Sequence, residues 1–343
     1  MVSFRALNTD NNPIMQAELA YQRRLTPPHP FRRRWLGRIV ALLAVTVTLI
    51  LFGGEVVGAL LYRDPTSIGD WFGFGTTLLV IGVVAQHFLL LFRTLSLAAN
   101  TIAREQHGHT WDMLVLTGVD ARRIVRGKWW ATVRRQWRAY ALLAVLRGGV
   151  VVWYGASTSR FFTSTLAAYG AYYSSSHYLS IPRAEHLLLA AVLVAALTLV
   201  NLGFTAAVGV AASAEMRSPV LTLARALFLR LLVLVVAAAL LSFLALLLSY
   251  LLAETLPIAA FSLTEWLNRL SIVLVDNGFS LGAELSNYHW SQPNYPTVAD
   301  NPVGYGLLAA FTSLALYALF TWMLLRLAQR QAVRQHALPP PLD

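Results

Sequence analysis

Residues 101–128 read TIAREQHGHTWDMLVLTGVDARRIVRGK, a polar and basic stretch between two strongly apolar runs. The chain has 343 residues, of which 57% are hydrophobic and 13% are charged. A soluble domain of this size has no interior large enough for so much apolar surface, so we expect lipid to be its main solvent. The basic stretch is then predicted to lie at the cytoplasmic surface of a membrane, within reach of a soluble partner.

The apolar runs predict an all-α polytopic membrane protein with six transmembrane helices. Each run is near or above the ~20 residues that a helix needs to cross a bilayer, and helices satisfy their own backbone groups in lipid. The predicted spans are 39–62, 71–99, 139–156, 185–212, 227–252 and 304–327. They are joined to a cytoplasmic N-terminal arm 1–38, in which 31–38 form an interfacial elbow helix, a cytoplasmic loop 100–138, outer loops 157–184 and 253–303, and a cytoplasmic tail 328–343.

The distribution of basic residues predicts the orientation. The arm, the loop 100–138, the loop after the fourth span and the tail carry most of the 27 Lys and Arg residues. This asymmetry places both termini in the cytoplasm, and we expect the bacterial inner membrane. A seventh span within 161–181 would turn the basic tail outward, so we interpret that segment as an aromatic, interfacial part of the outer loop. Arg93 and Arg230, near cytoplasmic span ends, are expected to snorkel.

The loop 100–138 has the signals of two short helices. Thr110 can cap the first helix, on which Trp111, Leu114 and Val115 form an apolar stripe. Asp120 can cap the second helix, which continues into the third span. These signals predict a rigid helix-turn-helix that can transmit a push. A plain amphipathic helix on the lipid headgroups fits the same residues equally well.

Several motifs resemble those of the permeases of type 2 ATP-binding-cassette (ABC) exporters. In that family the loop between spans 2 and 3 reads roughly E-R-E, then G-T-x-E-x-L-L, and ends in G-K. The matching residues here are Arg104, Glu105, Thr110, Leu114, Gly127 and Lys128, with Asp112 where the family commonly has Glu. Asn12-Pro13 followed by Glu18-Leu19 resembles the family's N-P-x-x-x-x-E-L opening, and 209–225 resembles the end of its span 4.

The resemblance implies a membrane half-transporter, here an exporter permease. Two such chains, alike or different, would form the translocation path in the bilayer, and a separate ABC ATPase subunit would hydrolyse ATP. The loop would be the coupling helix that docks on that subunit. Its expected docking residues are Arg104, Glu105, Thr110, Trp111, Asp112, Leu114 and Val115.

Polar residues inside the predicted spans are a second set of candidates. Glu55 and Arg147 lie at similar depths in spans 1 and 3, so they can form an ion pair if those helices are neighbours. Such a pair would either fix helix packing or form a polar patch on the translocation path. Gln86 and His87 are further polar residues of span 2 that we expect to face other helices.

Other functions find little support in the sequence. There are no cysteines, the P-loop pattern G-x-x-x-x-G-K-[ST] is absent, and we expect no enzyme activity, cofactor or metal site in this chain. His107 and His109 have no carboxylate at ligand spacing. The net charge of +11 is better explained by orientation and anionic lipid than by nucleic acid. The alternatives left open are a structural membrane subunit of a larger complex and, ranked last, an ion-coupled carrier.

Overall fold

The computed structural model of the chain describes residues 12–24, 42, 45, 46, 48, 73–107, 120–169, 184–215, 219–252, 257–281 and 302–337. These residues are all-helical, and no strand occurs among them. The helices are α1 (Pro13–Arg24), α4 (Gly73–His107), α6 (Ala121–Tyr169), α7 (Ala184–Ser213), α8 (Pro219–Leu252), α9 (Pro257–Asp276) and α11 (Pro302–Ala337).

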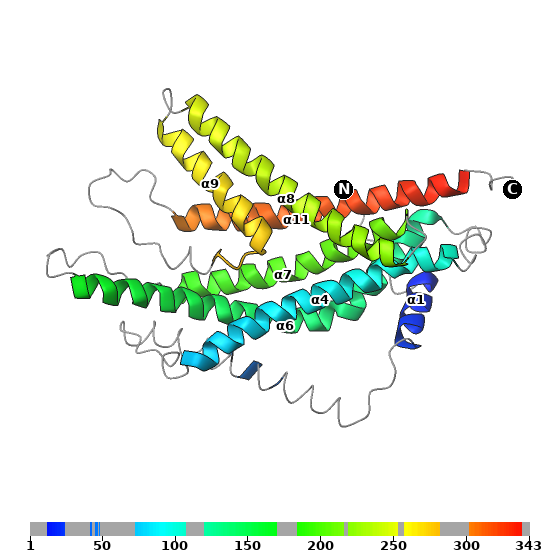
Figure 1. The fold of residues 1–343 in the computed structure, drawn as a ribbon, viewed down its shortest axis with the longest axis horizontal. Coiled ribbons are helices and arrows are strands. Elements are labelled where there is room, and N and C mark those ends of the chain that lie inside the picture. Colours follow the sequence, from blue (N-terminus) through cyan, green and yellow to red (C-terminus); the bar gives the residue numbers. More distant parts are fainter. Residues whose placement is uncertain are drawn as a thin grey trace.

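The long helix α7 is the centre of the bundle. It packs against α4, α6, α8 and α11, as Figure 1 shows. Small side chains of α7, including Ala206, Ala207 and Ala211, are buried there, so that neighbouring backbones can approach closely. Helix α8 leans away from the bundle with α9 folded back along it, and the short α1 packs on α6 near the end of the bundle where α11 finishes.

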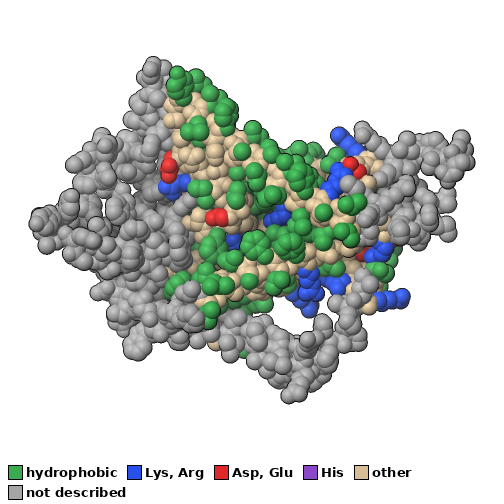
Figure 2. Space-filling model, in the orientation of Figure 1, with side chains coloured by type: hydrophobic (Ala, Val, Ile, Leu, Met, Phe, Trp, Pro, Cys, Tyr) green, Lys and Arg blue, Asp and Glu red, His purple; other side chains and the backbone are tan. Residues whose placement is uncertain are grey.

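Four helices in the described part of the chain are long and apolar enough to cross a membrane. They contain Leu78–Glu105, Leu187–Ser213, Val220–Leu251 and Gly306–Val333, which correspond to the predicted spans 2, 4, 5 and 6. Much of their surface is apolar and open to the surroundings, as expected of helices in lipid (Figure 2). The predicted span 1 lies almost entirely outside the described residues. The predicted span 3 lies within α6, which is not one of the four.

Helix α4 continues beyond the predicted second span, and α6 starts where a helix capped by Asp120 was predicted. Helix α4 runs on to His107 and α6 already starts at Ala121, so only residues 108–120 separate them. Asp120 caps α6 as predicted, because its Oδ1 accepts from the amide of Arg122 over 3.0 Å. At its other end α6 continues to Tyr169, so residues 161–169 extend the third predicted span as one helix. The interfacial location predicted for 161–181 stays a prediction.

The apolar residues of 261–275 recur at helical spacing, which predicts a helix, and α9 is that helix. Its buried stripe of Leu267, Leu270, Val273 and Leu274 packs into the bundle. The helix ends in a Schellman motif, in which Asn277 has a φ of 58° and the Gly278 amide donates to the Val273 carbonyl over 3.0 Å. This turn brings the end of α9 against the middle of α6.

Candidate functional site

Four charged side chains from three helices meet beside the loop between α4 and α6. Glu18 of α1 accepts from Arg104 Nη2 over 3.0 Å and from Lys128 Nζ over 3.3 Å. Glu105 Oε1 accepts from the same two nitrogens over 3.2 and 3.1 Å. We call Glu18, Arg104, Glu105 and Lys128 the ion-pair cluster. Its two carboxylates and two cations balance, so the helices share a neutral group of charges.

Lys128 is the centre of the cluster and the only lysine in the chain. It is 1% exposed, so its charge needs compensation from the protein. An ammonium group has three N–H donors. Here the third donates to the carbonyl of Thr101 over 2.8 Å, and the other two reach Glu18 and Glu105. The site therefore satisfies every donor of a buried lysine.

Helix α1 is held in this place by further contacts. The guanidinium of Arg104 lies over the ring of Tyr21, 3.6 Å from its centroid. Glu18 also accepts from Gln22 over 3.1 Å, and Gln22 accepts from Arg135 of α6 over 3.3 Å. A short helix from the N-terminal arm is thus attached by polar side chains to both α4 and α6.

Gly127 allows the start of α1 to approach α6 closely. A Cβ atom at Gly127 would lie 2.9 Å from Asn12 Nδ2 and 3.4 Å from Ile14 Cβ. Asn12 caps α1, because its Oδ1 accepts from the Ile14 amide over 3.1 Å. Its Nδ2 donates to the Arg123 carbonyl over 3.4 Å. The Asn-Pro and Gly-Lys pairs singled out in the sequence are therefore in contact.

The end of α7 packs on α4 next to the cluster. Ser213 Oγ accepts from the backbone amides of Ile102 and Ala103 over 2.8 and 2.9 Å. A Cβ atom at Gly209 would lie 2.4 Å from Ala98 Cβ, so this crossing depends on a residue without a side chain. The end of α4 is consequently held by α7 on one side and by the ion-pair cluster on the other.

The structure describes only part of the predicted coupling site. Arg104 and Glu105 lie in the ion-pair cluster and are half-buried. Thr110, Trp111, Asp112, Leu114 and Val115 lie outside the described residues. The predicted helix that carries them is therefore still a prediction. The described residues show which helices hold this segment. It connects α4 to α6, and the ion-pair cluster joins these two helices.

Arg147 lies in the middle of α6 and is 3% exposed. Its Nη1 donates to Thr198 Oγ1 over 3.0 Å, and its Nη2 donates to the carbonyls of Asp276 and Asn277, each over 3.1 Å. Glu55, its predicted partner, lies outside the described residues. Arg147 therefore caps the end of α9 with its guanidinium, since the carbonyls at a helix C-terminus have no partner within the helix.

We expect Arg147→Met to release the end of α9. Buried carbonyls left without a donor cost about 1–3 kcal/mol, so hydrogen exchange of the backbone amides in 270–281 should become faster. Hydrogen-exchange mass spectrometry measures this directly. The exposed Arg93 is the matched control, because Arg93→Met removes the same charge from a neighbouring helix. Unchanged exchange in 270–281 would show that Arg147 does not hold α9.

Arg230 corrects an expectation from the sequence. It is 7% exposed and does not snorkel. Its guanidinium bonds to Thr205 Oγ1 and to Asn201 Oδ1, the latter over 2.9 Å. Thr198, Asn201 and Thr205 follow one another at helical spacing, so α7 presents one polar stripe that binds an arginine from α6 and another from α8. Periodicity alone gave no indication of this stripe, because all three residues sit in a highly apolar run.

Among the described residues, no hydrogen bond joins the other polar candidates to these networks. Gln86 and His87 of α4 are half-buried. His87 Nδ1 is buried without a hydrogen-bond partner among the described residues. Within the same residues no three His, Asp or Glu side chains come close enough to hold a metal ion. The side chains of His107 and His109 lie outside the described part.

Glu18 is the functional candidate for which sequence reasoning assigned no role. The sequence offered two signals. Glu18 lies in a motif near a proline, and Lys128 is a lone lysine in a chain that otherwise uses arginine. Neither signal says which residues meet, because the charged partners of Glu18 are 86 and 110 positions away.

Comparison with known proteins identifies no relative. No protein-family model matches the chain, and neither the curated proteins nor the solved structures contain a match. The function is therefore argued from the residues and their contacts.

Proposed function

We propose that the chain is the permease subunit of an ABC exporter, in which it forms the translocation path while a separate ATPase subunit hydrolyses ATP. One observation carries the proposal. The motif residues Glu18, Arg104, Glu105 and Lys128 come from three distant segments, yet they join in one ion-pair cluster. A resemblance due to chance would not be expected to select residues that bind one another.

The cluster has the mechanical property that coupling requires. Residues 108–120 connect α4 to α6, and the ion-pair cluster joins the ends of these two helices to α1. A force applied to that segment would then move all three helices as one unit. Lys and Arg side chains gather toward this end of the molecule in Figure 2. That charge supports a cytoplasmic location, where the ATPase subunit would lie.

A second permease protomer, identical or different, completes the proposed transporter. Helix α8 supports this part, because many of its apolar side chains are exposed among the described residues. Phe228, Leu231 and Phe243, for example, are each more than 60% exposed. Lipid covers such a helix in a monomer, and a second copy can replace part of that lipid by packing.

The direct test is Trp111→Ala in the full chain. A tryptophan anchor in a docking groove typically contributes 2 kcal/mol or more, so the ATPase subunit should bind roughly 30-fold more weakly. The chain should still insert into the membrane. The measurement is co-purification from a mild detergent with mass spectrometry, followed by substrate-stimulated ATPase activity.

Trp137→Ala is the matched control, because Trp137 is a half-exposed tryptophan of α6 outside the segment 108–120. It should leave ATPase binding unchanged. A stable complex with an ATPase subunit that Trp111→Ala does not weaken would contradict the docking role of the loop. A complex with other membrane proteins, and no ATPase subunit, would contradict the proposal itself.

That last outcome is what the second candidate predicts. The ion-pair cluster also supports a structural membrane subunit. Its charges are all paired, which suits a rigid scaffold as well as a coupling device. An ion-coupled carrier has less support. Within the four candidate spans, the only carboxylate of the described residues is Glu105, which lies at the end of its span. A carrier needs such groups at mid-depth.

A further inference from the structure

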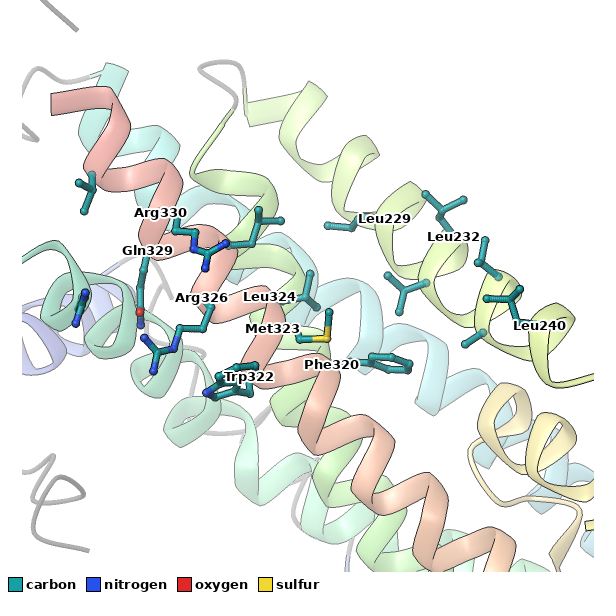
Figure 3. Close-up of a pocket in the computed structure, with 16 residues that line it drawn as sticks. Leu229, Leu232, Leu240, Phe320, Trp322, Met323, Leu324, Arg326, Gln329 and Arg330 are labelled. Carbon is teal, nitrogen blue, oxygen red and sulfur yellow. The ribbon is translucent and has the colours of Figure 1, made fainter. Parts of the chain in front are cut away.

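A groove of about 1320 Å³ lies over the face of α11, between α8 and the start of α6 (Figure 3). One half of it is apolar. The lining residues of α8 recur at helical spacing from Leu229 to Leu240, and those of α11 recur from Phe320 to Leu327. In Figure 3, Phe320, Met323 and Leu324 point toward the leucines of α8. Two apolar stripes thus face each other without filling the space between them.

The other half of the groove is cationic. Arg326 and Arg330 of α11 and Arg122 of α6 line it, and all three are exposed. None of them has an acidic partner among the described residues. Gln329 lies between the arginines, and its Oε1 has no hydrogen-bond partner in that part of the chain. In Figure 3, Arg326 and Gln329 project from the side of α11 that faces away from α8.

The dimensions of the groove match one leaflet of a membrane. From Leu229 to Leu240 α8 rises about 16 Å, at 1.5 Å per residue. Half of a hydrocarbon core is about 15 Å. If the apolar half lies in the hydrocarbon, Arg330 lies beyond Leu327, toward the lipid headgroups, and Arg326 reaches the same level along its side chain.

We propose that this groove binds one anionic phospholipid, with its phosphate among Arg122, Arg326 and Arg330 and its acyl chains between α8 and α11. The charge of the groove complements that headgroup. Free phosphate would leave the apolar half unused. A second copy docked symmetrically would bring two sets of arginines together, which like-charge repulsion opposes. The inference does not depend on the proposed transport function.

Native mass spectrometry of the full chain in mild detergent tests this, with phosphatidylglycerol and phosphatidylcholine of the same acyl chains as probes. One phosphatidylglycerol should be retained per chain, in preference to phosphatidylcholine. Each arginine near an anionic headgroup contributes about fivefold to binding affinity. The double variant Arg326→Gln with Arg330→Gln should therefore bind phosphatidylglycerol about 25-fold more weakly. Inorganic phosphate at millimolar concentration should not compete.

Two further variants separate a site from general attraction. Arg126→Gln with Arg138→Gln removes the same charge from exposed arginines that do not line the groove, and binding should persist. Ala237→Trp keeps every charge but fills the apolar half, and binding should be lost. Three results would each overturn the proposal. They are equal binding of phosphatidylglycerol and phosphatidylcholine, an equal loss of phosphatidylglycerol binding in both double arginine variants, and normal phosphatidylglycerol binding by the Ala237→Trp variant. Disulfide cross-linking of two chains through Val236→Cys would overturn it as well, and it is informative because the chain has no cysteine of its own.

Discussion

Lys128→Met should unfold the protein at a much lower temperature than the native chain. The substitution removes the ammonium that two carboxylates share, and it leaves Glu18, which is 4% exposed, with only the half-buried Arg104 as a cation. Removing one partner of a buried ion pair costs on the order of 3–5 kcal/mol, because the remaining charge stays in a medium that solvates it poorly. The thermal unfolding midpoint in detergent, measured by the loss of monodisperse protein, should show this.

A second substitution separates the charge from the side-chain volume. Lys128→Met combined with Glu18→Gln removes one positive and one negative charge, so it should recover a large part of the lost stability. Arg126→Met is the control, since Arg126 is an exposed residue of the same helix and should change the midpoint little. A native midpoint for Lys128→Met, or a double variant weaker than the single one, would show that the cluster does not stabilise the fold.

The sequence predicted the elements whose signals are local. Apolar runs located the four described candidate spans, the spacing of 261–275 located α9, and Asp120 was recognised as the cap of α6. These features depend on residues a few positions apart, so one sequence contains the information. Helix α6 extends beyond the predicted third span for a different reason. A helix can continue past the bilayer, and composition marks where lipid ends rather than where hydrogen bonds end.

The contacts between segments could not be predicted in the same way. Arg147 binds carbonyls at the end of α9, and a backbone acceptor leaves no signal in the sequence. Its ion pair with Glu55 stays a prediction, because Glu55 lies outside the described residues. Arg230 was expected to reach the membrane surface, but the polar stripe of α7 offers it a nearer partner. The resemblance selected the residues of the ion-pair cluster, yet their pairing follows from how α1 packs on α6.

Close packing and charge pairing act together at the end of α4. Ser213 Oγ accepts hydrogen bonds from the amides of Ile102 and Ala103, and the Thr101 carbonyl accepts one from Lys128 Nζ. Successive residues of one helical turn are therefore bound by two different neighbours. A displacement of α7 would disturb the backbone that positions the cluster, so the crossing of α4 and α7 should be sensitive to very small changes in volume.

Gly209→Ala is the smallest change that tests this crossing. The new Cβ would lie 2.4 Å from Ala98 Cβ and 3.2 Å from the backbone nitrogen of Ala99, so α4 and α7 have to separate. Overpacking of this kind costs about 1–3 kcal/mol. Separation would also stretch the bonds from Ser213 to α4. We expect a lower thermal midpoint and faster hydrogen exchange at 98–105.

Gly203→Ala on the same helix is the matched control. A Cβ there would lie 3.7 Å from Trp129 Cζ2, which is ordinary contact, and alanine is the better helix former by roughly 1 kcal/mol in water. The two substitutions therefore add the same methyl group to one helix with opposite expected signs. Ala98→Gly combined with Gly209→Ala exchanges the two sizes across the contact and should restore much of the stability. If Gly209→Ala behaves like Gly203→Ala, α4 and α7 do not pack as closely as the structure describes, and the support they give to the ion-pair cluster is lost with that contact.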